Sequence, residues 1–264
     1  MMMLSAASER GFWEWVAQIT TTYWPMFLQG MGVTLLIAIT GTLIGSLIGL
    51  IVGIVRTVPV HTRDSVAKKV FLKLVDVLLS VYIEVFRGTP MIVQAMVIYY
   101  GLAFAGVYLD TTIAGLIIVS INTGAYMAEI VRGGILSVDK GQFEAAHSVG
   151  MNHLQTMTSV VMPQVIRNIL PATGNEFVIN IKDTSVLNVI GVSELYFVSK
   201  GISGANFQYF PTFMVTCILY LFMTFTVTRI LRLVERRMDG SGTYTIHGSM
   251  TTPEQEIKVK RAKV

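Results

Sequence analysis

Three stretches of this sequence are long and apolar enough to cross a lipid bilayer. The first, 30–55, has no charged residue, and 111–130 and 207–227 have at most one charge each. A helix needs about 20 predominantly apolar residues to cross the hydrocarbon core. A soluble domain of 264 residues could bury one such helix but hardly three, so the sequence predicts an integral membrane protein.

Two further segments, 82–102 and 177–198, are apolar except for a few charged side chains, and we count both as membrane spans. Gly88 and Pro90 interrupt the first of them, which indicates a kink or a helix entry at that point. The predicted fold class is therefore all-α, an integral membrane helical bundle with five transmembrane helices. The amphipathic stretch 66–80 begins with lysines and is expected to lie along the inner membrane surface.

The basic residues predict the orientation of the chain. If the N-terminus lies outside, most of the 20 Lys and Arg residues fall in the loop 56–73, the central loop and the C-terminal tail. Cytoplasmic loops carry this excess in membrane proteins. A sixth crossing at 66–80 would largely remove the bias, so we expect the N-terminus outside and the C-terminus in the cytoplasm. The net charge of +4 follows from this topology and requires no nucleic-acid partner.

Composition divides the sequence into three parts. Residues 1–25 include a cluster of Trp and Tyr and are expected to form an interfacial segment, because these residues gather where a membrane meets water. Residues 26–238 form the transmembrane domain and include a polar loop at 137–165. Residues 239–264 are polar and rich in Gly, Ser and Thr, and we expect them to form a disordered cytoplasmic tail.

The first apolar run carries a regular pattern of small residues. Glycines recur there at every fourth position and line one face of a helix. They are Gly41, Gly45, Gly49 and Gly53. Small residues at this spacing allow two helices to approach closely in lipid. We therefore predict that this face packs against another helix.

Motifs of soluble catalysis are absent from the sequence. It contains no GxxxxGK[ST] nucleotide loop, no HExxH zinc motif and no GxSxG nucleophile elbow. The four histidines are scattered, and none pairs with the single cysteine at metal-binding spacing. We expect no catalytic residue, no cofactor and no metal, and the protein is not expected to be an enzyme. Transport driven by ATP would require an ATPase on another chain.

The central loop is unusually organised for a polar stretch between membrane spans. Asp139 followed by Gln142 is typical of a capping box, in which the two side chains cover free amides at a helix start. A helix is expected at 140–149. Gly150 then supplies the left-handed residue at which helices often stop.

A second helix is predicted directly after Gly150. Asn152 and Gln155 repeat the capping pattern, and this helix is expected to end near Pro163. Two short helices bent at a glycine form a knob on the cytoplasmic side. A helix presented in this way can dock into a groove of a partner protein.

The loop resembles a known motif. EAAHSVG at 144–150, followed after nine residues by VVMP at 160–163, is similar to the EAA loop of ATP-binding-cassette (ABC) importer permeases. Val160 and Met162 stand where that family has isoleucine and leucine, and both exchanges keep an apolar side chain of similar volume.

Three more stretches narrow the resemblance. The segments 84–102, 125–135 and 175–195 resemble, in the same order, the branch of these permeases that transports polar amino acids. The similarity covers most of 30–235. The chain is therefore identified as a member of the amino-acid importer permeases of the histidine/glutamine/arginine type.

This resemblance implies a fold, a mechanism and partners. The fold is that of a type I ABC importer permease, which carries a polar or charged amino acid across the bacterial cytoplasmic membrane by alternating access. Two ABC ATPase subunits would bind the EAA loop, and a second permease, identical or paralogous, would complete the pathway. No solute-binding domain is fused to the chain, so a separate extracytoplasmic solute-binding protein is expected.

The resemblance also implies two sets of functional residues. Contacts with the ATPase are expected from Phe143, Glu144, Ala145, Ala146, Gly150 and Met151. Hydrogen bonds to the substrate are expected from Gln94, Asn122, Asp183, Thr184 and Ser185. On residue chemistry alone, Glu144 could instead be a solvated charge on a helix face.

Charged residues within the predicted spans need partners, because a charge near the bilayer centre costs roughly 2.5–3.5 kcal/mol. Those considered are Glu84, Arg87, Glu129 and Lys182. We hypothesise that Arg87 and Lys182 pair with acids of other spans, either Glu84, Glu129 or Asp183. The alternative is that Glu84, Arg87 and Lys182 are structural ties near the inner interface, which long side chains can reach.

Two other classes of function compete with a transporter subunit that needs a separate ATPase. An ion-coupled secondary amino acid transporter would use the membrane charges but would leave the cytoplasmic knob without a role. A membrane-embedded enzyme would need a nucleophile–base pair or a metal cluster, and none can be assembled from the sequence.

Overall fold

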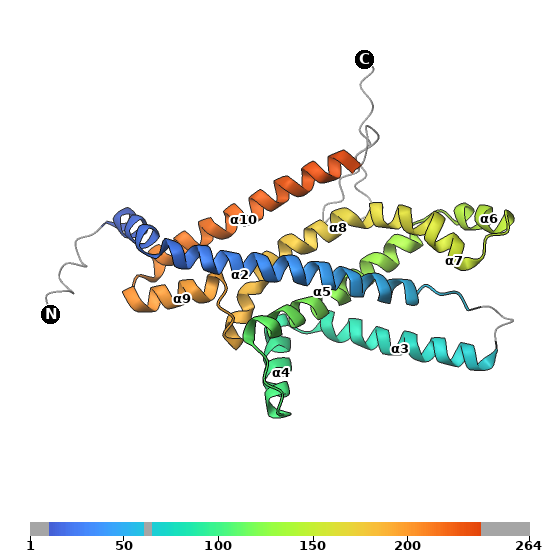
Figure 1. The fold of residues 1–264 in the computed structure, drawn as a ribbon, viewed down its shortest axis with the longest axis horizontal. Helices are drawn as coiled ribbons and strands as arrows, with labels where there is room; N and C mark the ends of the chain where they lie inside the picture. The colour runs from blue at the N-terminus through green and yellow to red at the C-terminus, as the bar shows by residue number, and fades with distance from the viewer. Residues whose placement is uncertain (1–10, 61–64, 239–264) are drawn as a thin grey trace, which may run out of the picture.

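Long helices that run along a common axis dominate the structure, a computed structural model that describes residues 11–60 and 65–238 (Figure 1). Within those ranges the chain is helical, with short connections and no strand. The elements are α2 (Phe12–Val55), α3 (Val66–Gly88), α4 (Met91–Phe104), α5 (Thr111–Leu136), α6 (Lys140–Ser148), α7 (His153–Thr156), the π-helical turn η1 (Met157–Val161), α8 (Met162–Asp183), the 3₁₀ segment η2 (Thr184–Ile190), α9 (Leu195–Asn206) and α10 (Tyr209–Met238). The tail expected to be disordered, 239–264, lies outside the described residues.

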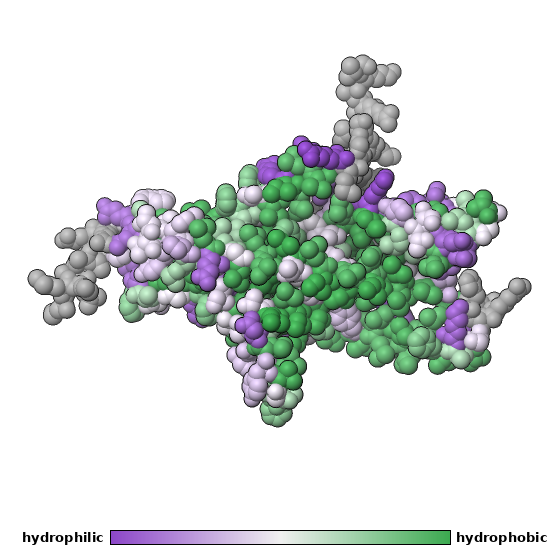
Figure 2. Space-filling view, viewed as in Figure 1, coloured by the Kyte–Doolittle hydropathy of each residue, from purple (hydrophilic) through white to green (hydrophobic). Residues whose placement is uncertain are grey.

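Within residues 11–60 and 65–238, three helices are long and apolar enough to cross a membrane: Phe12–Val55, Thr111–Leu136 and Tyr209–Arg237. They contain the first, third and fifth spans expected from the sequence. Figure 2 shows hydrophobic side chains over the middle of the long axis and hydrophilic side chains gathered toward its ends. The prediction of an all-α membrane bundle is confirmed.

Neither of the other two expected spans is one continuous helix in the structure, and for 82–102 the break indicated at Gly88 and Pro90 is confirmed. The stretch 82–102 is shared between α3 and α4, because Thr89 adopts an extended conformation (φ −122°, ψ 147°) before Pro90, as residues preceding proline prefer. The helix α4 has 14 residues, too few for a full crossing, and points away from the long helices (Figure 1). The amphipathic stretch 66–80 is the first part of α3 rather than a separate helix.

The segment 177–198 is broken in a different way. It begins inside α8, passes through η2 and turns at Gly191, whose φ of 85° lies in the left-handed region. It then enters α9, whose first turn is capped by the buried carboxylate of Glu194. This carboxylate accepts hydrogen bonds from the amides of Tyr196 and Phe197. Hydropathy alone did not indicate this turn.

The helix α2 is longer than a bilayer crossing. Its 44 residues correspond to about 66 Å at the usual rise per residue. It continues through Pro25, so the part of the expected interfacial segment that is described belongs to the same helix as the first span. Phe12, at its start, packs against Phe210 of α10 with a ring-centroid distance of 5.0 Å.

The central contact of the bundle is between α2 and α5. Each glycine of the α2 stripe faces a larger residue of α5, spaced at the same interval of four. The pairs are Gly41 with Val119, Gly45 with Thr123, Gly49 with Met127 and Gly53 with Val131. A Cβ added at Gly45 would lie 2.6 Å from the Cβ of Thr123, and one at Gly41 would lie 2.6 Å from a methyl of Val119. The two helices lie so close that only glycine fits.

A buried amide joins a third helix to this pair. Asn180 of α8 donates from Nδ2 to the hydroxyls of Thr42 (2.8 Å) and Thr123 (3.0 Å), which belong to α2 and α5. All three residues are buried. Because lipid offers no competing hydrogen bonds, this polar contact fixes α8 on the α2–α5 pair.

The α2–α5 contact predicts how glycine substitutions affect stability. Gly49→Ala should lower the free energy of unfolding by about 1–3 kcal/mol, because the added methyl overlaps the Met127 side chain and backbone. Gly32→Ala is the matched control on the same helix, since no atom lies within 4 Å of its added Cβ. It should be neutral or stabilise slightly. Unfolding titrations in mixed micelles measure both, and equal stability of the two variants would contradict the close packing.

Candidate functional site

The knob formed by α6 and α7 lies at one end of the long axis (Figure 1). Asp139 is the N-cap of α6, and its Oδ1 accepts the amide of Gly141 at 2.6 Å. The predicted capping box with Gln142 is wrong, because the Gln142 amide bonds to the backbone carbonyl of Asp139 at 3.0 Å instead. Asp139 is therefore still the N-cap of α6, but its side chain bonds to the amide of Gly141 and not to that of Gln142.

The end of α6 is a Schellman motif. The Met151 amide donates to the carbonyl of Ala146 (3.1 Å), and the Gly150 amide donates to that of His147 (3.0 Å). Gly150 has φ 84°, as predicted for a left-handed stop. This pair of bonds sets the angle between α6 and the segment that follows.

The second half of the knob starts as predicted and ends differently. The Asn152–Gln155 capping box is confirmed, with reciprocal bonds of 2.9 Å. The helix does not end near Pro163, because a π-helical turn at Met157–Val161 leads directly into α8. A proline clashes with the carbonyl four residues earlier in a regular α-helix. The wider π turn accommodates it, so the knob and α8 form one continuous element.

The six residues expected to contact the ATPase lie on two sides of the knob. Phe143, Ala146 and Met151 are buried or half-buried, and Phe143 packs on the cluster that includes Val131 and Val161. The exposed members are Glu144, Ala145 and Gly150. The first group attaches the knob to the bundle and only the second is open to a partner.

Two exposed apolar residues of the knob were missed in the sequence. Val149 is 77% exposed and Leu154 is 71% exposed, in a segment whose other surface residues are mostly polar. Together with Glu144 and Ala145 they form what we call the knob tip. The available signal was their apolar character in a polar loop, since neither is a fixed position of the motif that the loop resembles.

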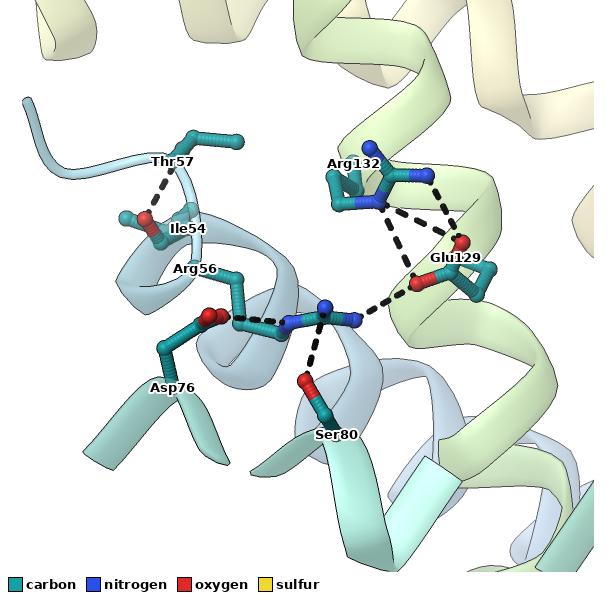
Figure 3. Close-up of polar contacts among 7 residues, drawn as sticks. All are labelled: Ile54, Arg56, Thr57, Asp76, Ser80, Glu129 and Arg132. Carbon is teal, nitrogen blue, oxygen red and sulfur yellow. Dashed lines mark hydrogen bonds and ion pairs between the residues drawn. The ribbon is translucent and has the colours of Figure 1, made fainter. Parts of the chain in front are cut away.

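A second polar site joins α2, α3 and α5 near the base of the knob (Figure 3). Arg56, directly after α2, donates to Glu129 of α5 at 2.7 Å and to Asp76 and Ser80 of α3 at 3.0 Å each. Arg132 also binds Glu129, at 2.9 Å. The side chains of Arg56 and Glu129 are only 17% and 24% exposed. One carboxylate thus holds two guanidinium groups.

The part of the chain that the structure describes contains no ion pair of the kind hypothesised for the membrane charges. Neither Arg87 nor Lys182 forms an ion pair with Glu84, Glu129 or Asp183. The Arg87 guanidinium lies over the Tyr126 ring, 5.4 Å from its centroid. The cation that binds Glu129 across helices is Arg56, which the sequence indicated only as a loop residue.

Two of the residues expected on the substrate pathway supply hydrogen bonds that are missing at the break between α3 and α4. Pro90 has no amide to offer the Phe86 carbonyl, and Gln94 Nε2 donates to that carbonyl instead, at 2.9 Å. Asn122 Nδ2 donates to the Gln94 side-chain oxygen, also at 2.9 Å. The structure thus uses both amides for backbone support.

The remaining expected pathway residues follow one another where α8 ends. Thr184 is buried and donates to the carbonyl of Ile181 at 3.0 Å, whereas Ser185 is half-buried and Asp183 is exposed. Glu176, two helical turns before Asp183 on the same face of α8, was not singled out in the sequence. It lies close enough to Asp183 and to Arg87 to interact with both electrostatically. These three charged groups form what we call the charged face.

Among the described residues, no group of three or more His, Cys, Asp or Glu side chains could hold a metal ion. The site therefore consists of a rigid exposed knob, a tie between three helices at its base, and a charged face on the membrane domain. Together with the long apolar helices, this describes a helical membrane protein that presents a capped polar element beyond its apolar part.

The chain belongs to the family of binding-protein-dependent transport system inner membrane components, whose model matches residues 65–240. The glutamine transport system permease protein GlnP of Escherichia coli (strain K12) is 42% identical over 160 residues, 60% of this chain and 73% of GlnP. The L-cystine transport system permease protein TcyB of Bacillus subtilis (strain 168) is 38% identical over 161 residues, 61% of this chain and 69% of TcyB.

Solved structures show the same fold. A crystal structure of an amino acid ABC transporter with histidines matches with a TM-score of 0.73 and 38% identity, and the match covers 83% of this chain and 96% of that chain. The MetNI methionine ABC transporter in an inward-facing conformation matches with a TM-score of 0.62 over 82% of this chain and 99% of that one. At 19% identity, this second likeness shows the fold alone.

The tie at Arg56 predicts unequal effects of removing its acids. Glu129→Gln should lower the free energy of unfolding by about 1.5–3 kcal/mol, because two guanidinium groups lose a charged acceptor. Asp76→Asn should cost less than about 1 kcal/mol, because the Asp76 side chain is 53% exposed. Unfolding titrations of both variants check this order, and a larger loss for Asp76→Asn would contradict it.

Proposed function

We propose that this chain is one of two permease subunits of an importer that moves a polar or charged amino acid across the bacterial cytoplasmic membrane, powered by two separate ATPase subunits. The observation that carries the proposal is the knob: a doubly capped, exposed element with an apolar tip, built into two helices of the membrane domain. The amino acid is suggested by the names of the relatives, which include permeases for glutamine and L-cystine.

The connections of the knob account for how movement would reach the membrane domain. Only Ser137 and Val138 separate α5 from the N-cap of α6, and Val138 is buried. At the other end, η1 joins the knob to α8 without a break. An ATPase that displaced the knob would therefore move α5 and α8 together. Such rigid-body motion of helices around a fixed site is the basis of alternating access.

The charged face offers what an amino acid needs. Every amino acid carries a carboxylate and an ammonium group. Arg87 supplies a cation and Glu176 and Asp183 supply anions, and Glu176 lies near enough to each of the other two to interact with it. We assign substrate contact to these groups, and we assign to Gln94 and Asn122 the role of holding the α3–α4 break in place.

The remaining partners follow from the same proposal. A solute-binding protein delivers the amino acid from outside, and a second permease, identical or paralogous, faces the charged face across the pathway. The N-terminus lies outside and the C-terminus in the cytoplasm, which places the knob beside the ATPases.

Uptake in proteoliposomes tests the function and separates it from ion-coupled transport. The chain is reconstituted with its co-purified ATPase and binding protein, and uptake of labelled glutamine, cystine, histidine and arginine is measured with and without ATP inside. We expect uptake of at least one of them that requires ATP and the binding protein. Uptake driven by a sodium or proton gradient without the ATPase would overturn the proposal.

Gly150 offers a test of coupling through the knob. Gly150→Val should reduce ATP-driven uptake at least about tenfold, because a β-branched residue strains the left-handed conformation and turns the second half of the knob. Gly150→Asn is the matched control, since asparagine tolerates this conformation, and it should retain most of the uptake. Both variants should insert and purify like the unaltered chain. Full uptake by Gly150→Val would show that the angle of the knob is unimportant.

The charged face makes a second prediction about transport. Glu176→Gln or Asp183→Asn should raise the KM for amino acid uptake about tenfold, because each removes a charge-assisted contact with the ammonium group. Glu14→Gln, an exposed acid near the start of α2, serves as the control and should leave KM unchanged. If neither acid of the charged face affects KM or the choice of amino acid, the assignment of this face is wrong, although ATP-driven uptake would remain intact.

A further inference from the structure

A pocket with a volume of about 450 Å³ lies between the first part of α3 and the chain that leaves α2. Val58 lines it on the α2 side, and Lys69 and Lys73 line it on the α3 side. Arg56 and Asp76, which belong to the tie shown in Figure 3, line it as well. Cationic and apolar side chains therefore meet in one pocket near the base of the knob.

The charges of this pocket favour an anion. Three of its four charged side chains are cations, and the guanidinium of Arg56 is already bound by two carboxylates. Lys73 is exposed and forms no ion pair within residues 11–60 and 65–238. An anion in the pocket would therefore meet Lys73 directly, with Lys69 one turn away on the same face of α3.

An apolar stripe runs along α3 beside these lysines. Its members are Val66, Val70, Leu74 and Val77, each about half exposed or more. The helical repeat places the stripe on the face next to the one that holds Lys69 and Lys73. Ile83 is the only buried residue of α3, so the protein itself leaves this helix largely uncovered. Figure 2 shows the surface over α3 as largely hydrophobic.

The pocket and the stripe together match a phospholipid better than a free anion. Inorganic phosphate would bind the lysines but would leave the apolar stripe exposed to water, whereas a phospholipid places a phosphate and an acyl chain side by side. Val55, the last residue of α2, lines the pocket, and α2 has the length and composition of a membrane span. The pocket therefore lies where a membrane span ends, at the level of the lipid head groups.

We propose that this pocket binds the phosphate of an anionic phospholipid through Lys69 and Lys73, with an acyl chain along the apolar stripe of α3. In the orientation proposed above, the lipid belongs to the cytoplasmic leaflet, whose anionic lipids attract basic segments beside membrane spans. The pocket is distinct from the charged face, and binding there does not require an amino acid.

Native mass spectrometry of the full-length chain tests the proposal with phosphatidylglycerol and phosphatidylcholine that carry identical acyl chains. We expect phosphatidylglycerol to bind more tightly. Lys73→Gln and Lys69→Gln should each lower this preference about fivefold, because each removes one cation from the phosphate. Lys140→Gln is the matched control and should keep the preference, because Lys140 is an exposed cation at the same end of the molecule that does not line the pocket (Figure 1).

Equal affinity of the unaltered chain for the two lipids would overturn the proposal. So would an equal loss of preference in Lys73→Gln and Lys140→Gln, because it would show a general attraction between a basic protein and an anionic lipid.

A second pair of variants tests the acyl-chain part of the site. Leu74→Gln makes the stripe polar and should weaken binding of both lipids at least about threefold. Leu47→Gln makes the same exchange at an exposed position of α2 outside the stripe, and it should leave binding unchanged. Equal effects of the two variants would show that no acyl chain lies along α3.

Two further measurements distinguish a lipid from other occupants. Millimolar inorganic phosphate should not displace phosphatidylglycerol from the unaltered chain, and displacement would show a site for free anions. A benzophenone side chain at Val58 should capture phospholipid in membranes, whereas capture of a protein chain would show that a subunit covers the pocket. None of these measurements depends on ATP-driven uptake, so their failure would leave the proposed function standing.

Discussion

The close contact of α2 with α5 determines where every other element of the described structure lies. In lipid there is little hydrophobic drive for helices to associate, so packing and hydrogen bonds must hold them together. The glycine stripe brings the two backbones near enough for Asn180 to reach a hydroxyl on each, and α8 is thereby fixed in the same contact. Any larger residue in the stripe would separate Thr42 from Thr123 and remove the place where Asn180 binds.

Once α2, α5 and α8 are fixed, the breaks in the helical segments set the directions of the segments that follow them. Pro90 removes an amide, and Gln94 and Asn122 supply the missing donors, so the turn from α3 into α4 is held in one geometry. The π turn before Pro163 and the left-handed Gly150 act similarly at the other end, where they set the direction of the knob relative to α8. Polar residues that the sequence suggested as substrate contacts, such as Gln94 and Asn122, therefore stabilise irregular backbone, as membrane proteins require.

The sequence predicted the features that depend on local chemistry. The apolar spans in α2, α5 and α10, the capping box at Asn152 and the left-handed Gly150 each follow from residues within a few positions of one another. The segments 82–102 and 177–198 are each divided between helices. Gly88 and Pro90 indicated the first break, whereas hydropathy, which measures composition and not the direction of the chain, did not indicate the turn at Gly191. The Arg56–Glu129 bond joins residues 73 positions apart, and nothing near either residue indicates it. Pro163 suggested a helix end because the π turn that accommodates it has no recognised sequence pattern.

The ties between helices are unevenly distributed, and this bears on how the domain can move. Charged bonds at Arg56 and Glu129 join α2, α3 and α5 near the knob, and the Asn180 amide joins α8 to α2 and α5. The C-terminal half of α10 has no such bond to these helices in the described residues, and meets them across an apolar groove. Apolar packing alone therefore joins this end of α10 to α8 in the described residues. If the knob drives α8, α2 and α5 would follow through the Asn180 amide, whereas this end of α10 would follow only through apolar contact.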